Sequence, residues 1–351
     1  MNDLTEEDLK LRCFTIADEI KKNDSFLKNE NISIFNSSFL PLKNSDNYLI
    51  ASRGWYGNIR SWEGKNFIIL SLFNKHLRKL NQNILDLPKN LKINKIVNKN
   101  FDSEIKYHGS SKTDGPEDPR LFYHTDGEIY ILFNDINTKF KDKKRHMFIA
   151  KVNPTNLTYE NRQSLCESLS SNFEKNWGTF TYKNDTYLLY NINPLTIYKI
   201  DNINRGSCVN ILQSENKLLK KFDDFFPDLG FHLRNSTNLI PFDAPGDSPA
   251  LFLGLGHAVL DYKGYSDINK YIFPSLKSSN YSKIDKDYFK NFTKLYLGFF
   301  YILDMGNKKI KKISPFFQLP NYESKQELIF FPTSIHMDNK KFINISYNVG
   351  Y

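Results

Sequence analysis

Alternating hydrophobic and polar positions mark five short pairs of strands along this chain, each joined by a turn of small polar residues. The pattern predicts five antiparallel β-hairpins, over residues 36–53, 118–134, 177–191, 237–257 and 331–347. Each hairpin collects polar residues at the start of its first strand and the end of its second strand. These two positions lie side by side at the open end of an antiparallel hairpin. We therefore expect five polar edges that surround one site.

The spacing of the hairpins predicts a closed repeat fold. Successive hairpins begin about 60 to 95 residues apart, which fits four-stranded propeller blades with loop insertions. A chain of 351 residues exceeds the usual size of one layered core, but a closed repeat carries this length as one domain. The 15% aromatic content suits half-buried strands and also stacking against sugars. The prediction is an all-β, five-bladed β-propeller catalytic domain over residues 31–351.

The N-terminal segment has a different pattern. Residues 4–30 carry apolar side chains at roughly helical spacing, and Thr5 with acidic neighbours opens the segment as a helix cap does. This predicts a helical extension over residues 1–30 that packs outside the β structure or forms a homo-oligomer contact. No apolar run reaches the ~18 residues of a membrane span, and the N-terminus lacks a signal sequence. We expect a soluble, cytoplasmic protein.

The charge and the cysteine content limit which ligands, metals and disulfides are expected. The net charge of +9 favours an anionic ligand, an acidic membrane surface or nucleic acid. The lysines are scattered among many asparagines, and no Arg-rich stripe or nucleic-acid motif accompanies them, so nucleic acid is not expected. The three cysteines, Cys13, Cys166 and Cys208, have no short paired spacing. We therefore predict neither a zinc site nor a disulfide framework, and no metal or other cofactor.

The sharpest motif is Gly115-Pro-Glu-Asp-Pro-Arg120 at the start of the second hairpin. Pro119 stiffens the chain after Asp118. Pro116 biases the residue before it, Gly115, toward an extended conformation. In an extended segment, Glu117 and Asp118 point to opposite sides, so one carboxylate faces the common centre and the other accepts hydrogen bonds from loop amides. The hexapeptide alone fits a capped turn with a surface Asp–Arg pair as well as a catalytic site.

A second motif, Glu174-Lys-Asn-Trp177, opens the third hairpin. A cation at Lys175, an amide at Asn176 and an aromatic ring at Trp177 suit a sugar or its phosphate, with Trp177 as a stacking wall. The alternative is a solvated loop with Trp177 in the core. Gly254 and Gly256 on the fourth hairpin would allow a ligand or another backbone to approach closely. The remaining candidate contacts at the polar edges are Asn36, Arg53, Arg60, Asn191, Arg234, His257 and Tyr347.

The order of these motifs resembles the mannoside phosphorylases of glycoside hydrolase family 130, which are five-bladed propellers, and the related β-1,2-mannosyltransferases and phosphorylases of glycosyltransferase family 108. Gly115-Pro-Glu-Asp-Pro-Arg120 is similar to the Gly-x-Glu-Asp-Pro-Arg signature of that group, and Gly254-Leu-Gly-His257 matches in order. The resemblance runs from about residue 33 to the C-terminus. It implies that Asp118 is the general acid and that Arg53, Arg120, Lys175 and His257 contact sugar or phosphate.

The expected chemistry follows from what each reaction needs. An inverting phosphorylase needs one acid, because phosphate already carries the charge to attack the anomeric carbon. An inverting hydrolase needs a second carboxylate ~6.5–9.5 Å away to activate water. Cationic candidates outnumber additional carboxylates at the polar edges, which favours a phosphate nucleophile or, in reverse, a phosphorylated sugar donor. Together with this, the resemblance implies inverting β-mannosyl transfer between a carbohydrate acceptor and mannose 1-phosphate or GDP-mannose. A hydrolase and a non-catalytic glycan-binding propeller remain open alternatives.

Overall fold

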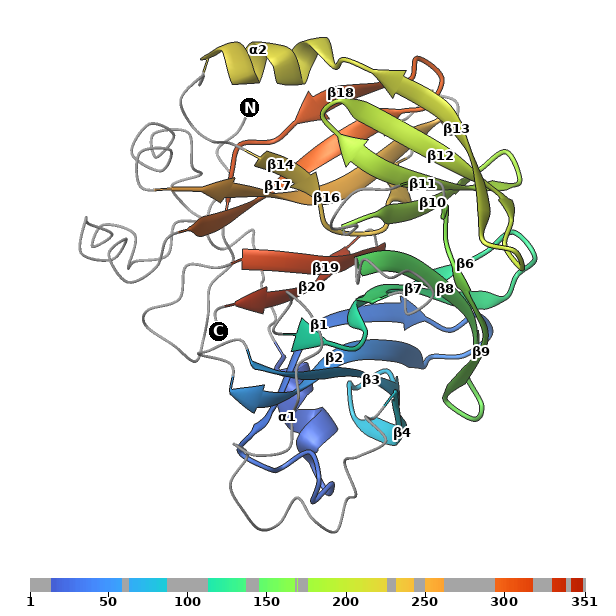
Figure 1. The fold of residues 1–351 in the computed structure, drawn as a ribbon, viewed down its shortest axis with the longest axis vertical. Helices are drawn as coiled ribbons and strands as arrows, with labels where there is room; N and C mark the ends of the chain where they lie inside the picture. Colours follow the sequence, from blue (N-terminus) through green and yellow to red (C-terminus); the bar gives the residue numbers. More distant parts are fainter. Residues whose placement is uncertain are drawn as a thin grey trace.

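The computed structural model describes residues 14–58, 63–86, 113–136, 145–167, 169, 176–225, 232–242, 250–261, 294–317, 330–338 and 342–349. Within them, four sheets each contain a path of four antiparallel strands, and a fifth sheet has two (Figure 1). Blade 1 contains β1 (Ile32–Pro41), β2 (Tyr48–Asn58), β3 (Glu63–Phe73), β4 (Lys79–Leu85) and the short parallel β5 (Thr113–Asp114). Blade 2 contains β6 (Glu117–Tyr123), β7 (Ile129–Ile136), β8 (Arg145–Asn153) and β9 (Thr158–Ser164).

The second half of the chain repeats this arrangement. Blade 3 contains β10 (Gly178–Tyr182), β11 (Asp185–Ile192), β12 (Leu195–Asn202) and β13 (Ser207–Ser214), and helix α2 (Lys217–Phe225) follows it. Blade 4 contains β14 (His232–Asn235), β15 (Ile240–Pro241), β16 (Leu251–Leu260), β17 (Leu295–Asp304) and β18 (Lys309–Ile313). The fifth sheet pairs β19 (Phe330–Met337) with β20 (Ile343–Val349).

The five predicted hairpins are present as β1–β2, β6–β7, β10–β11, β14/β15–β16 and β19–β20. Their registers place the ends as expected: Arg53 lies opposite Phe35, and His257 lies opposite Arg234. The fourth hairpin differs from the prediction because its first strand begins at His232 and is interrupted between Asn235 and Ile240.

Neighbouring sheets are joined at or beside their innermost strands, which closes the ring. Between blades 2 and 3, β6 packs against β10, and side-chain or backbone hydrogen bonds join the other four pairs. The donor and acceptor pairs are Leu121 N to Ser38 Oγ (3.0 Å), Leu239 N to Thr179 O (2.9 Å), Ile335 N to Asn238 Oδ1 (3.3 Å) and Phe39 N to Ser334 Oγ (3.0 Å). The fifth sheet therefore lies between blade 4 and blade 1 (Figure 1). The predicted all-β propeller arrangement is confirmed for four blades. Five complete blades are not confirmed, because the fifth sheet has two strands in the described chain.

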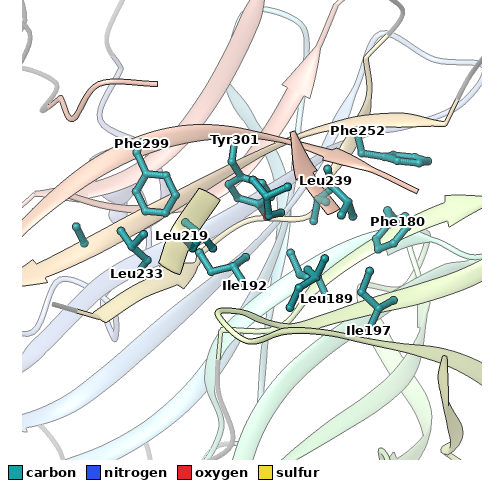
Figure 2. Packing of buried hydrophobic residues seen from close by; sticks show 14 of the residues in the cluster. Phe180, Leu189, Ile192, Ile197, Leu219, Leu233, Leu239, Phe252, Phe299 and Tyr301 are labelled. Atoms are coloured by element: carbon teal, nitrogen blue, oxygen red, sulfur yellow. The ribbon is translucent and has the colours of Figure 1, made fainter. Parts of the chain in front are cut away.

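Apolar side chains fill the spaces between blades, as the alternating pattern requires. Figure 2 shows this seam between blades 3 and 4, where Phe180 of β10 meets Phe252 of β16 with ring centroids 4.9 Å apart. Leu189 and Ile197 pack from blade 3, and Phe299 is fully buried on β17. Burying one such side chain contributes about 1.5–3 kcal/mol. The seams therefore supply a large part of the fold's stability.

The N-terminal segment packs against blade 1. Among residues 14–30 the structure has a single short helix, α1 (Ile16–Lys21), and residues 1–13 of the predicted extension lie outside the described residues. Ile20, Phe26 and Leu27 are buried in a cluster with side chains of β1, β2 and β3. A long helix over residues 4–30 is thus not shown.

A disulfide joins blade 2 to blade 3, so the prediction of no disulfide is wrong. Cys166 follows β9 and pairs with Cys208 on β13, 42 residues further along the chain, with the Cα atoms 5.2 Å apart. Cys166 N also donates to Gly206 O at 2.8 Å. Short sequence spacing is unnecessary here because the fold brings the outer edges of two blades together.

Candidate active site

Three polar residues in or next to the first strand of a blade share an unusual backbone conformation. Asn36, Asp118 and Asn176, which come from blades 1, 2 and 3, have φ angles of 50°, 52° and 64°. Asn and Asp tolerate this left-handed region better than other side chains that carry a Cβ atom. Strand pairing shifts register at the first two positions, which is the mark of a β-bulge that re-aims a side chain. Asp118 is thus the acidic member of a repeated structural feature.

Asp118 receives two hydrogen bonds from blade 1. Asn36 Nδ2 donates to Asp118 Oδ1 at 2.6 Å, and Arg53 Nη1 lies 3.2 Å from the same oxygen. The Asp118 side chain keeps 13% of its exposure, so a ligand can still reach it. Gly115 is not extended as predicted: its φ is +90°, and a Cβ atom there would lie 2.3 Å from the carbonyl oxygen of Asn66. The turn before Asp118 therefore requires glycine.

Glu117 lies on the same side of the strand as Asp118, contrary to the prediction. Its Oε1 atom accepts from Arg53 Nη2 (3.0 Å), Arg145 Nη2 (2.9 Å) and Asn66 Nδ2 (3.1 Å). The bulge between Glu117 and Arg120 breaks the alternation on which the prediction rested. The partners of Glu117 are therefore two guanidinium groups and an amide side chain, not the predicted loop amides.

Arg120 connects the cluster to blade 4. Its Nε donates to Ser236 O at 2.9 Å, and its Nη1 donates to Asp118 O at 3.3 Å. Arg120 is 3% exposed, and burial lowers its pKa to about 10 although Asp118 opposes this shift. In the described part of the chain Arg120 Nη2 has no hydrogen-bond partner. A buried guanidinium with an unused donor is suited to an anion.

His257 continues this path through blade 4. Its Nδ1 lies 2.5 Å from Ser236 Oγ, and its ring packs against Phe331 of the fifth sheet, with centroids 4.9 Å apart. Arg234 is half-buried and lies opposite His257. The glycines of β16 allow a close approach, but of protein groups. A Cβ atom at Gly254 would lie 2.2 Å from the Tyr301 ring, whereas one at Gly256 would lie 2.5 Å from both the Phe299 ring and the backbone carbonyl of Arg234, as the alternative of a neighbouring backbone predicts.

Several predicted residues lie elsewhere or in the core. Trp177 is 2% exposed and packs on Tyr190 with ring centroids 5.2 Å apart, so it is a core residue and not an exposed stacking wall. Asn191 Nδ2 donates to the carbonyl of Asn193 at 2.9 Å and orders a turn. Tyr347 packs on Phe330 at 5.2 Å. Arg60 and Lys175 lie outside the described residues.

Arg145 makes several contacts in the cluster, although the sequence did not predict it. Besides Glu117, its guanidinium contacts Asn134 Oδ1 through Nε at 2.7 Å and Gly115 O through Nη2 at 2.8 Å. Nη1 has no hydrogen-bond partner among the described residues. The available signal was an arginine at the start of β8, the third strand of the blade, whereas the predicted polar edges comprise only the first two strands.

The arrangement suits anionic chemistry. The guanidinium groups of Arg53 and Arg145 contact the carboxylates of Glu117 and Asp118. A third guanidinium group, that of Arg120, donates to the backbone carbonyl of Asp118. Such a site attracts phosphate through charge-assisted hydrogen bonds. Within the described ranges no three His, Cys, Asp or Glu side chains are grouped as a metal site, and no helix is long and apolar enough to cross a membrane.

Comparison with known proteins agrees with the fold. The sequence matches no protein-family profile and no curated protein. The structure is similar to the mannose phosphorylase MPT-4 from Leishmania mexicana in complex with phosphate ion, with a TM-score of 0.51, 11% identity, and coverage of 92% of this chain and 82% of that chain. It is also similar to a glycosyl hydrolase from Bacteroides ovatus, with a TM-score of 0.52, 10% identity, and coverage of 90% and 82%. At these identities the likeness shows the fold alone.

Proposed function

We propose that this protein transfers a β-mannosyl group with inversion, to or from a phosphate-bearing donor, as a β-mannoside phosphorylase or a β-mannosyltransferase. The observation that carries the proposal is the surplus of buried guanidinium groups around one reachable carboxylate, Asp118. A structural neighbour named as a mannose phosphorylase, with phosphate bound, supports it. In this reading β19 and β20 represent the fifth blade of the propeller.

In phosphorolysis, Asp118 donates its proton to the glycosidic oxygen, directly or through a sugar hydroxyl. The bond between the anomeric carbon and that oxygen breaks, and a phosphate oxygen bonds to the anomeric carbon from the opposite face. The products are a sugar 1-phosphate of inverted configuration and a free hydroxyl on the leaving sugar. In the synthetic direction Asp118 accepts the proton of the acceptor hydroxyl.

The surrounding groups divide the work of binding. Arg120 Nη2 and Arg145 Nη1 are donors without partners in the described chain and are suited to phosphate. The Oδ1 atoms of Asn36 and Asn176, equally without partners in that part of the chain, are suited to accept from sugar hydroxyls. The remaining candidates stay predictions as substrate contacts: Glu117, Arg53, His257, Lys175, Arg60, Asn191, Arg234 and Tyr347. Trp177 is not among them, because it lies in the core.

Hydrolysis is the second candidate, because a neighbour of the same fold is named a glycosyl hydrolase. An inverting hydrolase needs a base carboxylate ~6.5–9.5 Å from the acid, with room for a water molecule between them. Glu117 directly precedes Asp118 and is held by Arg53 and Arg145, which makes it a poor base. The geometry of the cluster therefore favours a phosphate nucleophile over water.

The test is a donor panel. The protein is mixed with mannose 1-phosphate or GDP-mannose and mannose acceptors, and release of phosphate or GDP is followed. We expect release with one of the two donors. No release with either, together with cleavage of mannosides in phosphate-free buffer, would assign a hydrolase. Binding of a mannoside without turnover would assign a glycan-binding propeller.

Lys175 gives a second test. Lys175→Ala should weaken binding of phosphate in isothermal titration much more than binding of a neutral mannose disaccharide, because a charge-assisted contact is lost with little apolar area. Lys151→Ala is the matched control, since Lys151 pairs with Glu128 at 3.2 Å on the outer part of blade 2. Equal loss for both ligands would make Lys175 a structural residue.

A further inference from the structure

Arg53 holds two neighbouring carboxylates at once. Its Nη1 lies 3.2 Å from Asp118 Oδ1, and its Nη2 lies 3.0 Å from Glu117 Oε1. Its Nε donates to Asn66 Oδ1 at 2.7 Å, and the Arg53 side chain is 6% exposed. The guanidinium group is therefore fixed by three contacts and cannot turn away from Asp118.

This contact creates a conflict with proton donation. A cation within ~4–6 Å of a carboxyl group favours its ionised form, and burial strengthens the effect. A general acid must instead hold its proton close to the working pH. A second carboxylate in contact with the same guanidinium removes this conflict. Its negative charge offsets the positive charge of Arg53 and disfavours the ionised form of Asp118. Glu117 supplies that charge.

Arg145 acts on Glu117 from the other side. Its Nη2 lies 2.9 Å from Glu117 Oε1, and its side chain is 7% exposed. The positive charge of Arg145 therefore partly compensates the negative charge of Glu117 and reduces the effect of Glu117 on Asp118. The two residues should influence Asp118 in opposite directions.

We propose that Glu117 is a positioning residue that raises the proton affinity of Asp118 by offsetting Arg53, with Arg145 setting the size of the effect. The catalytic meaning of this inference rests on the proposed function. Arg53 of β2 contacts the Asp118 carboxylate, and Arg120 of β6 itself donates to the Asp118 backbone carbonyl. The other charged and imidazole side chains described on the strands that pack against β6 are Lys65 on β3, Asp135 on β7 and His336 on β19, and Asp135 is paired with Arg162 at 2.7 Å.

The experiment is a direct titration of Asp118. The full chain is labelled with carbon-13 at the aspartate carboxyl carbon, and the Asp118 signal is assigned by its loss in Asp118→Asn. Glu117→Gln should lower the titration midpoint of Asp118 by about one pH unit, and Arg145→Gln should raise it. Glu128→Gln is the matched control, because this half-exposed glutamate is on the same blade and pairs with Lys151 at 3.2 Å.

Opposite shifts are the signature that a merely structural role would not produce. No shift in either folded variant, or a shift in the same direction in both, would overturn the inference. If one variant does not fold, as judged by circular dichroism, the sign of the shift in the other decides. The basic limb of kcat/KM for phosphorolysis should move to lower pH in Glu117→Gln.

The two proposals fail separately. Shifts in the titration of Asp118 without turnover of any phosphorylated sugar would refute the proposed function and leave the electrostatic role of Glu117 intact. Turnover that depends on Asp118, with a titration unaffected by Glu117→Gln and Arg145→Gln, would do the reverse.

Discussion

The charged cluster around Asp118 and the apolar seam between blades 3 and 4 are made by equivalent hairpins but filled in different ways. In the seam, side chains such as Phe180 and Phe299 are buried against other apolar groups (Figure 2). In the cluster, guanidinium groups are buried against carboxylates, and Arg120 and Arg145 each keep a donor without a partner in the described chain. Buried ion pairs contribute little net stability because desolvation offsets their attraction. The seam thus stabilises the propeller, whereas the cluster adds little stability and is the site at which we propose binding and catalysis.

The largest expected effect is on catalysis. Asp118→Asn should reduce turnover by about 10²–10⁴ because the acid is lost. The fold should stay intact, since asparagine tolerates the left-handed backbone of this position as Asn36 and Asn176 do. Turnover and thermal unfolding of the variant are to be measured side by side. Full activity in a folded Asp118→Asn protein would remove Asp118 from the mechanism.

A substitution in the seam should reduce stability, in contrast to Asp118→Asn, which should reduce turnover. Phe299→Ala should lower the free energy of unfolding by about 3–5 kcal/mol, because a fully buried ring is replaced by a cavity. Denaturant unfolding measures this loss. Val209→Ala is the control, because Val209 is 52% exposed and should change stability little. A larger loss of stability from Asp118→Asn than from Phe299→Ala would contradict the division between seam and cluster.

The disulfide is expected to have a smaller effect. Replacing Cys166 and Cys208 with serine should lower the free energy of unfolding by about 2–4 kcal/mol, because the closed loop no longer restricts the unfolded chain. Thiol labelling of the denatured wild type should find one thiol before reduction and three after it. Three thiols before reduction would show that the bond does not form. Disulfides persist mainly in oxidising compartments, so this count also bears on the predicted cytoplasmic location.

The hairpins could be predicted because alternation and turn residues are local signals, and the resulting registers bring Asn36, Arg53 and Asp118 together. The ion pair between Glu117 and Arg145 could not be predicted, because it depends on a bulge in β6 and on the third strand of the blade. The disulfide could not be predicted for the same reason, because Cys166 and Cys208 meet only when the outer edges of blades 2 and 3 pack together.

Trp177 shows a different limit. Its position before a strand fits both a stacking wall and a core residue, and only the packing of blades 2 and 3 decides for the core. The repeated left-handed positions were also missed, because the conformations of Asn36, Asp118 and Asn176 are properties of the backbone rather than of hydrophobic pattern. The sequence thus predicted which hairpins bring Asn36, Arg53 and Asp118 together, but not the contacts that support them.

The most direct test of the account is the phosphate dependence of cleavage. Wild-type protein is incubated with a panel of β-linked mannobioses, with and without inorganic phosphate, and the products are identified by phosphorus and proton magnetic resonance. The account predicts that at least one disaccharide is cleaved only when phosphate is present, giving mannose and α-mannose 1-phosphate. Cleavage to two mannose molecules that proceeds equally without phosphate would contradict it.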